Sequence, residues 1–372
     1  GIFGLNNFSK SPGWNFILGS QDSEIRNIAA ERGWLVKNDY LNSPFIQSRS
    51  KNFQFRSSIQ PLNSFRIQLD AKRIVSENFQ ETFRFNSQKN SYVSLTPTRG
   101  GTFSLSFLAI RTSFIKDDEL NNSPTFTRFT KNREIIRDRL NNLNTQGEYG
   151  LNSQDVLIPA FISAYSDSDP SSYSLKPFPK IPIPNWRVDF SGLSKIESLS
   201  EIFSNITISH AYQSIYSIGE FSNSLLYVDN LDFNNSIMNY PLASQQTENG
   251  LIPFYIINQV RITERFSPLI GINVRTKNNL NARVDYKKDR NIMLNLSNSQ
   301  VSEMRNSDFS LDFGYTKDKL KLPFKYMGNT IILDNEIEFR LNFIIRNTKT
   351  IQRKIDKESV VTNGNYNFQL RP

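Results

Sequence analysis

Cysteine is absent from the 372 residues of this chain, and histidine occurs once. The lack of cysteine excludes disulfides, cysteine zinc sites and iron–sulfur clusters within the chain. A single imidazole cannot supply the two or three that common catalytic zinc sites use. We therefore expect no metal site and no cofactor.

Long apolar runs are also missing. No stretch of about eighteen apolar residues occurs, so the sequence predicts no transmembrane helix, although transmembrane strands stay possible. The chain starts at Gly1-Ile2-Phe3 without an initiator methionine, a basic leader or a small-residue cleavage site. We interpret it as a fragment of a longer protein.

Hydrophobic residues make up only 38% of the chain, whereas aromatic residues reach 12%. Disordered chains are poor in aromatic residues, and an ordinary α/β enzyme has more leucine, valine and alanine to bury. Apolar side chains confined to alternate positions would explain both figures. The composition therefore predicts β structure with one wet face.

Positive charge is in excess, since Lys+Arg 44 against Asp+Glu 35 gives a net charge of +9. These cations are spread along the polar sides of the predicted strands and form no single stripe, so we expect no nucleic-acid partner. A basic lumen, or loops that face anionic lipopolysaccharide, fits the charge equally well.

Strict alternation marks the C-terminal part, where successive side chains of a strand point to opposite faces. The apolar face, predicted to meet lipid, holds Leu280, Ala282, Val284, Tyr286, Phe309, Leu311, Phe313, Phe339, Leu341 and Phe343. The polar face, predicted to line a lumen, holds Arg283, Asp285, Lys287, Glu338, Arg340 and Asn342. Ile344 is the one apolar residue among the polar positions of its strand.

Short polar segments at 276–279, 288–291 and 305–308 are typical of hairpin turns. With the alternation, they predict an antiparallel meander over 205–372. It starts with a strand at Ile206–Ile218 and is regular from about Asn258 onward.

The N-terminal part, 1–115, is predicted to hold further barrel strands, with a short helical insert near 22–33. We expect these strands at 52–59, 65–74, 78–86 and 102–114. Between the two strand regions, 116–204 reads as a helical and Pro-rich insertion with helices at 133–143, 155–165 and 194–203.

Two all-β architectures fit this alternation. Several predicted strands reach about ten residues, long enough to cross a bilayer at a tilt, and their apolar sides end in tyrosines such as Tyr216, Tyr227, Tyr286 and Tyr315. These features favour an antiparallel transmembrane β-barrel section over a soluble β-sandwich. The insertion, unsuited to lipid, is then expected in the lumen or the periplasm.

No group of residues predicts catalysis. His210 has no second histidine or cysteine beside it, and packing is its expected role. The acidic clusters 117–119 and 167–169 are interpreted as solvated loop charge, with calcium binding as the alternative. Gly100-Gly101 lacks the lysine of a phosphate-binding loop. We expect a non-enzyme with no catalytic residues.

Several stretches resemble the SprA/Sov family, the outer-membrane translocon of the type IX secretion system in Bacteroidota. They occur in order along nearly the whole chain, at 11–14, 153–161, 183–188, 209–217, 262–271, 277–288 and 347–351. The residues that best mark them are Trp14, Pro159, Trp186, His210, Pro268 and Gly271.

The resemblance implies a section of a very large single-chain barrel in the bacterial outer membrane. Such a barrel exports folded cargo proteins that carry C-terminal sorting domains, and it serves gliding motility in some species. The implied partners are outer-membrane lipid, cargo, a plug protein, a PorV-like shuttle protein and periplasmic or motor components. A small-solute porin or receptor barrel, and a soluble β-sandwich adhesion protein, remain the alternatives.

Overall fold

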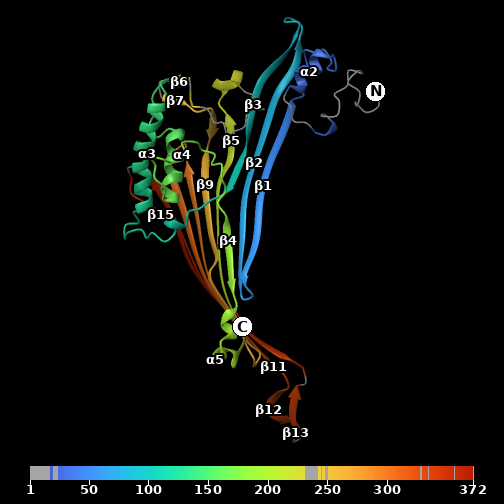
Figure 1. Ribbon diagram of the computed structural model, residues 1–372, viewed down its shortest axis with the longest axis vertical. Helices are drawn as coiled ribbons and strands as arrows, with labels where there is room; N and C mark the ends of the chain where they lie inside the picture. Colours follow the sequence, from blue (N-terminus) through green and yellow to red (C-terminus); the bar gives the residue numbers. More distant parts are fainter. Residues whose placement is uncertain are drawn as a thin grey trace.

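The computed structural model describes residues 17–19, 24–230, 242–243, 245–247, 250–326, 329–333, 335–355 and 357–371. An antiparallel sheet of 11 strands dominates it (Figure 1). The path β1-β2-β3-β5-β9-β10-β11-β14-β15 crosses this sheet; of the short strands, β4 pairs with β2 and β5, and β8 pairs with β5. The fold is therefore all-β and antiparallel, as the alternation predicted.

The strands of this path are long. Their bounds are β1 Phe45–Leu62, β2 Phe65–Asn86, β3 Ser91–Ser106, β5 Phe203–Asn223, β9 Gln259–Thr276, β10 Leu280–Asn295, β11 Gln300–Lys317, β14 Ile337–Lys354 and β15 Val360–Arg371. β9, β10 and β11 are joined by short turns, which confirms the C-terminal meander. β2 is one continuous strand where the sequence predicted two.

One strand position of the sheet is filled by two separate strands. β4, Asn185–Phe190, and β3 both lie between β2 and β5. β3 pairs with the upper half of β2, from Arg73 onward, and β4 pairs with its lower part, from Asp70 downward. The chain leaves the sheet after β3 and returns at β4. The helical insertion therefore occupies 107–184, whereas the sequence placed it at 116–204.

The insertion covers the upper part of one sheet face. Its helices α3, Pro124–Leu143, and α4, Gln154–Ser166, lie side by side against the strands (Figure 1). α3 begins with Pro124 after the capping residue Ser123, whose hydroxyl accepts from the Phe126 amide. α4 is apolar on all sides and buried along most of its length. Both helices were predicted within these bounds.

The core lies between the helices and the sheet. Its members include Phe129, Phe161, Tyr216, Val260, Ile292, Leu294 and Val301. Tyr216 donates its hydroxyl proton to the Pro177 carbonyl at 2.9 Å, and Tyr227 donates to the Ile252 carbonyl at 2.8 Å. The expectation that these two tyrosines sit at a membrane interface was wrong, because the insertion and its neighbouring loops bury both.

Smaller elements complete the described part. They are α2 Ile25–Glu31, η3 Ile110–Thr112, η4 Gly192–Lys195, α5 Glu197–Ser200, η5 Leu225–Asn230, β6 Gln245–Thr247, β7 Gly250–Ile252, β8 Tyr255–Ile257, β12 Leu320–Tyr326 and β13 Asn329–Leu333. α2 matches the helix predicted near 22–33. η4 and α5 replace the helix predicted at 194–203, where β5 already begins, and η3 stands where a strand was predicted to run on to Phe114.

Two of the predicted hairpin turns are not turns. Residues 288–291 lie inside β10 and residues 305–308 lie inside β11, in unbroken pairing with each other. Only the segment after Thr276 turns where expected. Among them, Lys288, Arg290 and Arg305 interrupt the apolar pattern because they bind residues of the insertion.

Candidate functional site: an apolar belt and a polar face on one sheet

Cross-strand pairing sorts the side chains of the sheet into horizontal rows. Residues that pair directly across neighbouring strands share a face and a height. One row passes from β2 to β15 through Phe65, Phe190, Ile208, Ile272, Val284, Leu311, Phe343 and Leu370. Every member is apolar. This row lies on the face that, higher up, carries the helices.

The adjacent row, one residue along each strand, has the opposite character. It contains Arg66, Asp189, Ser209, Gly271, Asp285, Ser310, Ile344 and Gln369. Ile344 is the apolar exception noted in the sequence. The two predicted sets of side chains, apolar and polar, thus lie on two separate faces of one sheet.

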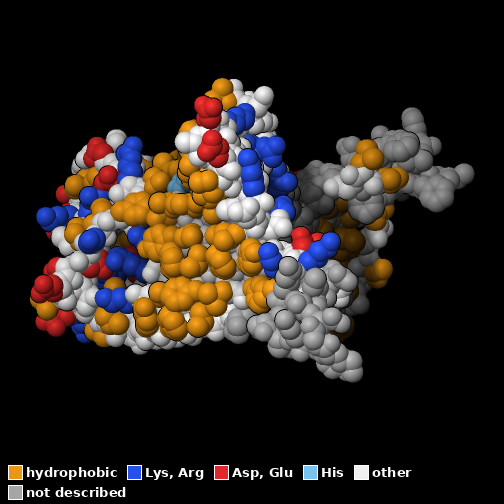
Figure 2. Space-filling model, turned by 90° about the horizontal axis from the view of Figure 1, so that it is seen from below, with side chains coloured by type: hydrophobic (Ala, Val, Ile, Leu, Met, Phe, Trp, Pro, Cys, Tyr) orange, Lys and Arg blue, Asp and Glu red, His pale blue; other side chains and the backbone are white. Residues whose placement is uncertain are grey.

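The apolar rows below the insertion form what we call the belt. Its predicted members Leu280, Ala282, Val284, Tyr286, Phe309, Leu311, Phe313, Phe339, Leu341 and Phe343 all share this face through their pairings. No segment of the described chain covers the belt, so that Phe339 is 51% exposed and Leu370 is 57% exposed. Hydrophobic side chains gather in one broad patch seen from below (Figure 2).

The upper border of the belt is a row of different composition. It runs through Leu69, Trp186, Tyr212, Phe266, Lys288, Ser307, Asn347 and Tyr366. Apart from Leu69, the members of this row are aromatic residues, a lysine and small polar residues. From Leu280 to Lys288, β10 rises about 27 Å at about 3.4 Å per residue.

Buried charges lie directly above that border. Glu264 accepts from Arg290 at 3.0 Å, and the Tyr212 hydroxyl donates to the same carboxylate at 2.9 Å. Glu303 and Asp117 both accept from Arg353, each at 2.6 Å, and the Arg353 side chain is fully buried. A buried charge is tolerated only with such partners.

A segment of the insertion binds these charges. We call residues 109–122, between β3 and α3, the crossing segment, because it contacts β9, β10, β11 and β14 in turn. The Ser113 hydroxyl donates to Glu264 at 2.6 Å, and the Ser113 carbonyl accepts from Lys288 at 2.8 Å. Asp117 binds Arg305, and Asn121 accepts from Lys349 at 2.6 Å. The crossing segment therefore ties the insertion to the sheet.

The acidic clusters of the insertion have separate roles. Asp117 belongs to the buried ion pairs just described, contrary to a purely solvated role. Asp118 is exposed, and hydrogen bonds from the side chain and backbone of Asn122 lower its pKa. Asp169 accepts from the Ser171 amide at 2.9 Å, which lowers its pKa in the same way. Each carboxylate thus stays ionised within a local turn.

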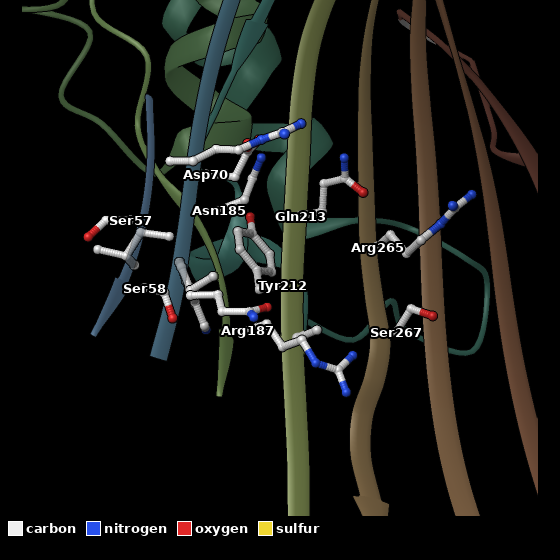
Figure 3. A pocket seen from close by; sticks show the side chains of 14 residues that line it. Ser57, Ser58, Asp70, Asn185, Arg187, Tyr212, Gln213, Arg265 and Ser267 are labelled. Carbon is white, nitrogen blue, oxygen red and sulfur yellow. The ribbon is translucent and has the colours of Figure 1, made fainter. Parts of the chain in front are cut away.

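The polar face carries a groove of about 530 Å³ over β1, β2, β4, β5 and β9 (Figure 3). Arg56, Arg187 and Arg265 line it, with Asp70, Gln68 and Gln213. Each arginine has a carboxylate nearby: Asp70 at 3.1 Å, Asp189 at 2.9 Å and Asp289 at 3.3 Å. The groove is open, and its charged and amide side chains lie among apolar surface, which makes up most of the lining.

The other predicted polar residues also lie on this face. Arg283 pairs with Asp285 at 2.7 Å, and Arg340 pairs with Glu338 at 2.7 Å. Asn342 donates to Asp312. Lys287 lies one position along from the exposed Tyr286, on the polar side of β10. Asp285 is buried, because it packs over Gly271, where no side chain would fit.

The marker residues lie in separate parts of the fold. Trp186 and His210 belong to the belt and its border, and their rings are 6.5 Å apart. His210 Nδ1 donates to the Leu269 carbonyl at 2.7 Å, which agrees with a packing role. Pro268 and Gly271 lie at the irregularity of β9, and Pro159 is buried inside α4. Trp14 is outside the described residues.

Sequence reasoning missed the buried ionic residues Glu264, Arg290, Glu303 and Arg353, and the half-buried Arg305. The sequence did contain a signal for them: these charged residues stand at strand positions whose side chains point to the apolar face. Among the described residues, no three acidic or histidine side chains are placed to hold a metal ion, and no helix is long and apolar enough to cross a membrane.

Comparison with known proteins adds no identity. Neither a protein-family model nor a curated protein matches this sequence.

Proposed function

We propose that this chain is a wall section of an outer-membrane β-barrel and that the barrel is a protein-conducting channel of the type IX secretion kind. The observation that carries the membrane part is the belt, an uncovered apolar band that continues from β2 to β15. Soluble monomers rarely expose apolar patches of more than a few hundred Å². Lipid is the partner that such a band fits, because outer-membrane barrels bear an apolar band about 25 Å tall with aromatic borders.

The two edges of the sheet support closure by further strands. In the described chain, β1 and β15 each pair with one neighbour only. Backbone groups at an open edge cannot stay unpaired in hydrocarbon. Further strands on both sides would pair these edges, and the proposed barrel is then larger than this chain.

With the belt toward lipid, the polar face with its arginine-lined groove faces the lumen. Its mixed charges, most of them already paired, offer a wet surface along which a folded cargo protein can pass without binding tightly. The insertion then lies outside the barrel wall, on the lipid side. An apolar face toward lipid excludes an insertion in the lumen, and we retain the apolar face toward lipid. The periplasmic alternative for the insertion is compatible with this placement.

The secretion activity itself rests on the family resemblance of the sequence. It implies cargo with C-terminal sorting domains, a plug protein, a PorV-like shuttle protein and periplasmic or motor components as partners. The test is depletion of the full-length protein in its own cell, followed by measurement of cargo in periplasm and medium. We expect sorting-domain proteins to accumulate in the periplasm; unchanged secretion would refute the translocon.

A small-solute porin or receptor barrel is the second candidate, favoured by the open groove on the polar face, which three arginines line. Conductance of the purified full-length protein in planar bilayers separates the two. A porin conducts ions without activation, whereas a plugged translocon conducts only when the plug is removed.

A further inference from the structure

The insertion presents apolar side chains along the edge beside the belt. Phe114 is 52% exposed, and its ring lies 5.4 Å from the Phe266 ring and 4.5 Å from the Lys288 ammonium. Leu120, also in the crossing segment, is 75% exposed. The buried ion pairs fix this segment at one height, so these exposed side chains are held in place.

A second segment of the insertion, residues 180–183, lies at the same edge. The Lys180 carbonyl accepts from Arg73 of β2 at 3.0 Å, and the Ile183 amide donates to the last residue of β3 at 3.0 Å. Between them, Ile181 is 79% exposed. The crossing segment and residues 180–183 thus both carry exposed apolar side chains next to the upper border of the belt.

The side chains at this height match one surface chemistry. Trp186, Tyr366 and Phe114 are aromatic, and the Lys288 ammonium stands over the Phe114 ring. Amphipathic rings and lysines with apolar stems gather where hydrocarbon meets headgroups. Buried ion pairs start one row higher, where lipid tails could no longer reach.

We infer that the underside of the insertion, formed by the crossing segment and residues 180–183, rests on the lipid headgroup layer, with Phe114, Leu120 and Ile181 inserted at the hydrocarbon boundary. This inference rests on the proposed membrane function. The occupant of the surface is the lipid surface itself, and the insertion fixes how deeply the wall section sits in the bilayer.

Spin-label accessibility in the full-length protein tests this placement. The absence of cysteine from this chain gives each introduced thiol a clean background within it. We would label Phe114→Cys and Ile181→Cys, with Phe339→Cys as the belt control and the exposed Glu134→Cys on α3 as the water control. The vesicles contain phosphatidylethanolamine and phosphatidylglycerol, and the probes are oxygen, which partitions into lipid, and a water-soluble nickel chelate.

At positions 114 and 181, we expect an oxygen-to-nickel accessibility ratio several-fold above that at position 134 and below that at position 339. Leu120→Cys provides a second site, since this exposed side chain can be replaced without loss of packing.

Ratios at 114, 120 and 181 equal to that at 134, with position 339 in lipid, would overturn the inference and leave the proposed function standing. Labels shielded from both probes would also overturn it, because a protein surface would then cover the insertion. A water-like ratio at position 339 would refute the membrane function itself.

Discussion

The side-chain oxygen of Asn185 accepts the backbone N–H of Ser214 at 2.7 Å, at the point where β3 has ended and β4 has just begun. The Asn185 amide also donates to the Ser106 hydroxyl at 3.3 Å, and that hydroxyl accepts from the Lys72 amide at 2.9 Å. Side chains thus replace the backbone groups that an unbroken strand would offer. The sheet therefore stays continuous at this position, although the insertion separates β3 from β4 in the sequence.

Replacement of Asn185 should weaken the sheet at this break. Asn185→Leu leaves the buried Ser214 amide without an acceptor, at a cost of about 1–3 kcal/mol. Hydrogen exchange measured by mass spectrometry should show faster exchange in the β5 segment around Ser214. Asn281→Leu, at an exposed position of the polar face, is the control. Equal exchange in both variants would contradict this role of Asn185.

Gly101 is expected to tolerate no side chain. A Cβ there would lie 1.9 Å from the Ser76 carbonyl oxygen of the paired strand. Gly101→Ala should therefore force β2 and β3 apart, and overpacking of this kind costs about 1–3 kcal/mol or more. Gly314→Ala is the matched control, since its nearest neighbours stand 4.0 Å away. Thermal unfolding measures both; a control as damaging as Gly101→Ala would refute the explanation.

The buried charge cluster predicts that replacing Glu303 lowers the stability of the protein much more than replacing Glu338. Glu303→Gln removes a buried carboxylate that binds Arg353 and Arg305. Loss of one partner of a buried ion pair costs about 3–5 kcal/mol. Glu338→Gln should change stability little, because its pair with Arg340 is exposed to solvent.

Limited proteolysis of the crossing segment, together with thermal unfolding, measures the difference between these glutamates. Cleavage near 109–122 should rise in Glu303→Gln alone, since the segment loses its anchor. Similar protease resistance in both variants would show that the cluster does not hold the insertion.

An introduced arginine should impair assembly when it lies on the belt and should leave assembly unchanged when it lies on the polar face. Ala282→Arg places a guanidinium on the belt, where a lipid-facing arginine near mid-bilayer costs about 2–4 kcal/mol. Asn281→Arg places the same group on the exposed polar face of the same strand, and assembly should proceed. The heat-modifiable electrophoretic shift of the full-length protein reports assembly. Equal behaviour of the two variants would refute the lipid side of the belt.

The faces of the C-terminal strands were predictable because alternation is a local property. Val284 and Asp285 are adjacent in the chain, and a strand must point them to opposite sides. The hairpin after Thr276 was equally local. For the same reason α4 could be located from the sequence to within one residue at each end, and α3 at its C-terminal end, although α3 begins nine residues before the predicted start.

The charged part of the strands was not predictable from local pattern. Arg290 donates to the Thr112 carbonyl, a partner 178 positions away in the chain. Without that partner, Lys288 and Arg290 look like turn residues, and so does Arg305. Residues 288–291 and 305–308, at and above the border of the belt, were therefore wrongly predicted to be hairpin turns.

The divided strand position was hidden for a related reason. Residues 185–190 follow a run of prolines that cannot join a sheet, and their strand character depends on β2 and β5 standing open to receive them. The sequence of residues 185–190 alone does not indicate that β2 and β5 leave a strand position free between them. The insertion consequently was predicted to end too late.

The divided strand position also sets an order of assembly. Once the chain has formed β2 and β3, the lower half of β2 still lacks a neighbour on that side, and β4 is made only after the entire insertion. Closing this long loop is entropically costly unless α3 and α4 have already brought its ends together. Folding of the helical insertion is thus a precondition for completing the sheet at the height of the belt, so an unfinished insertion leaves an open seam there.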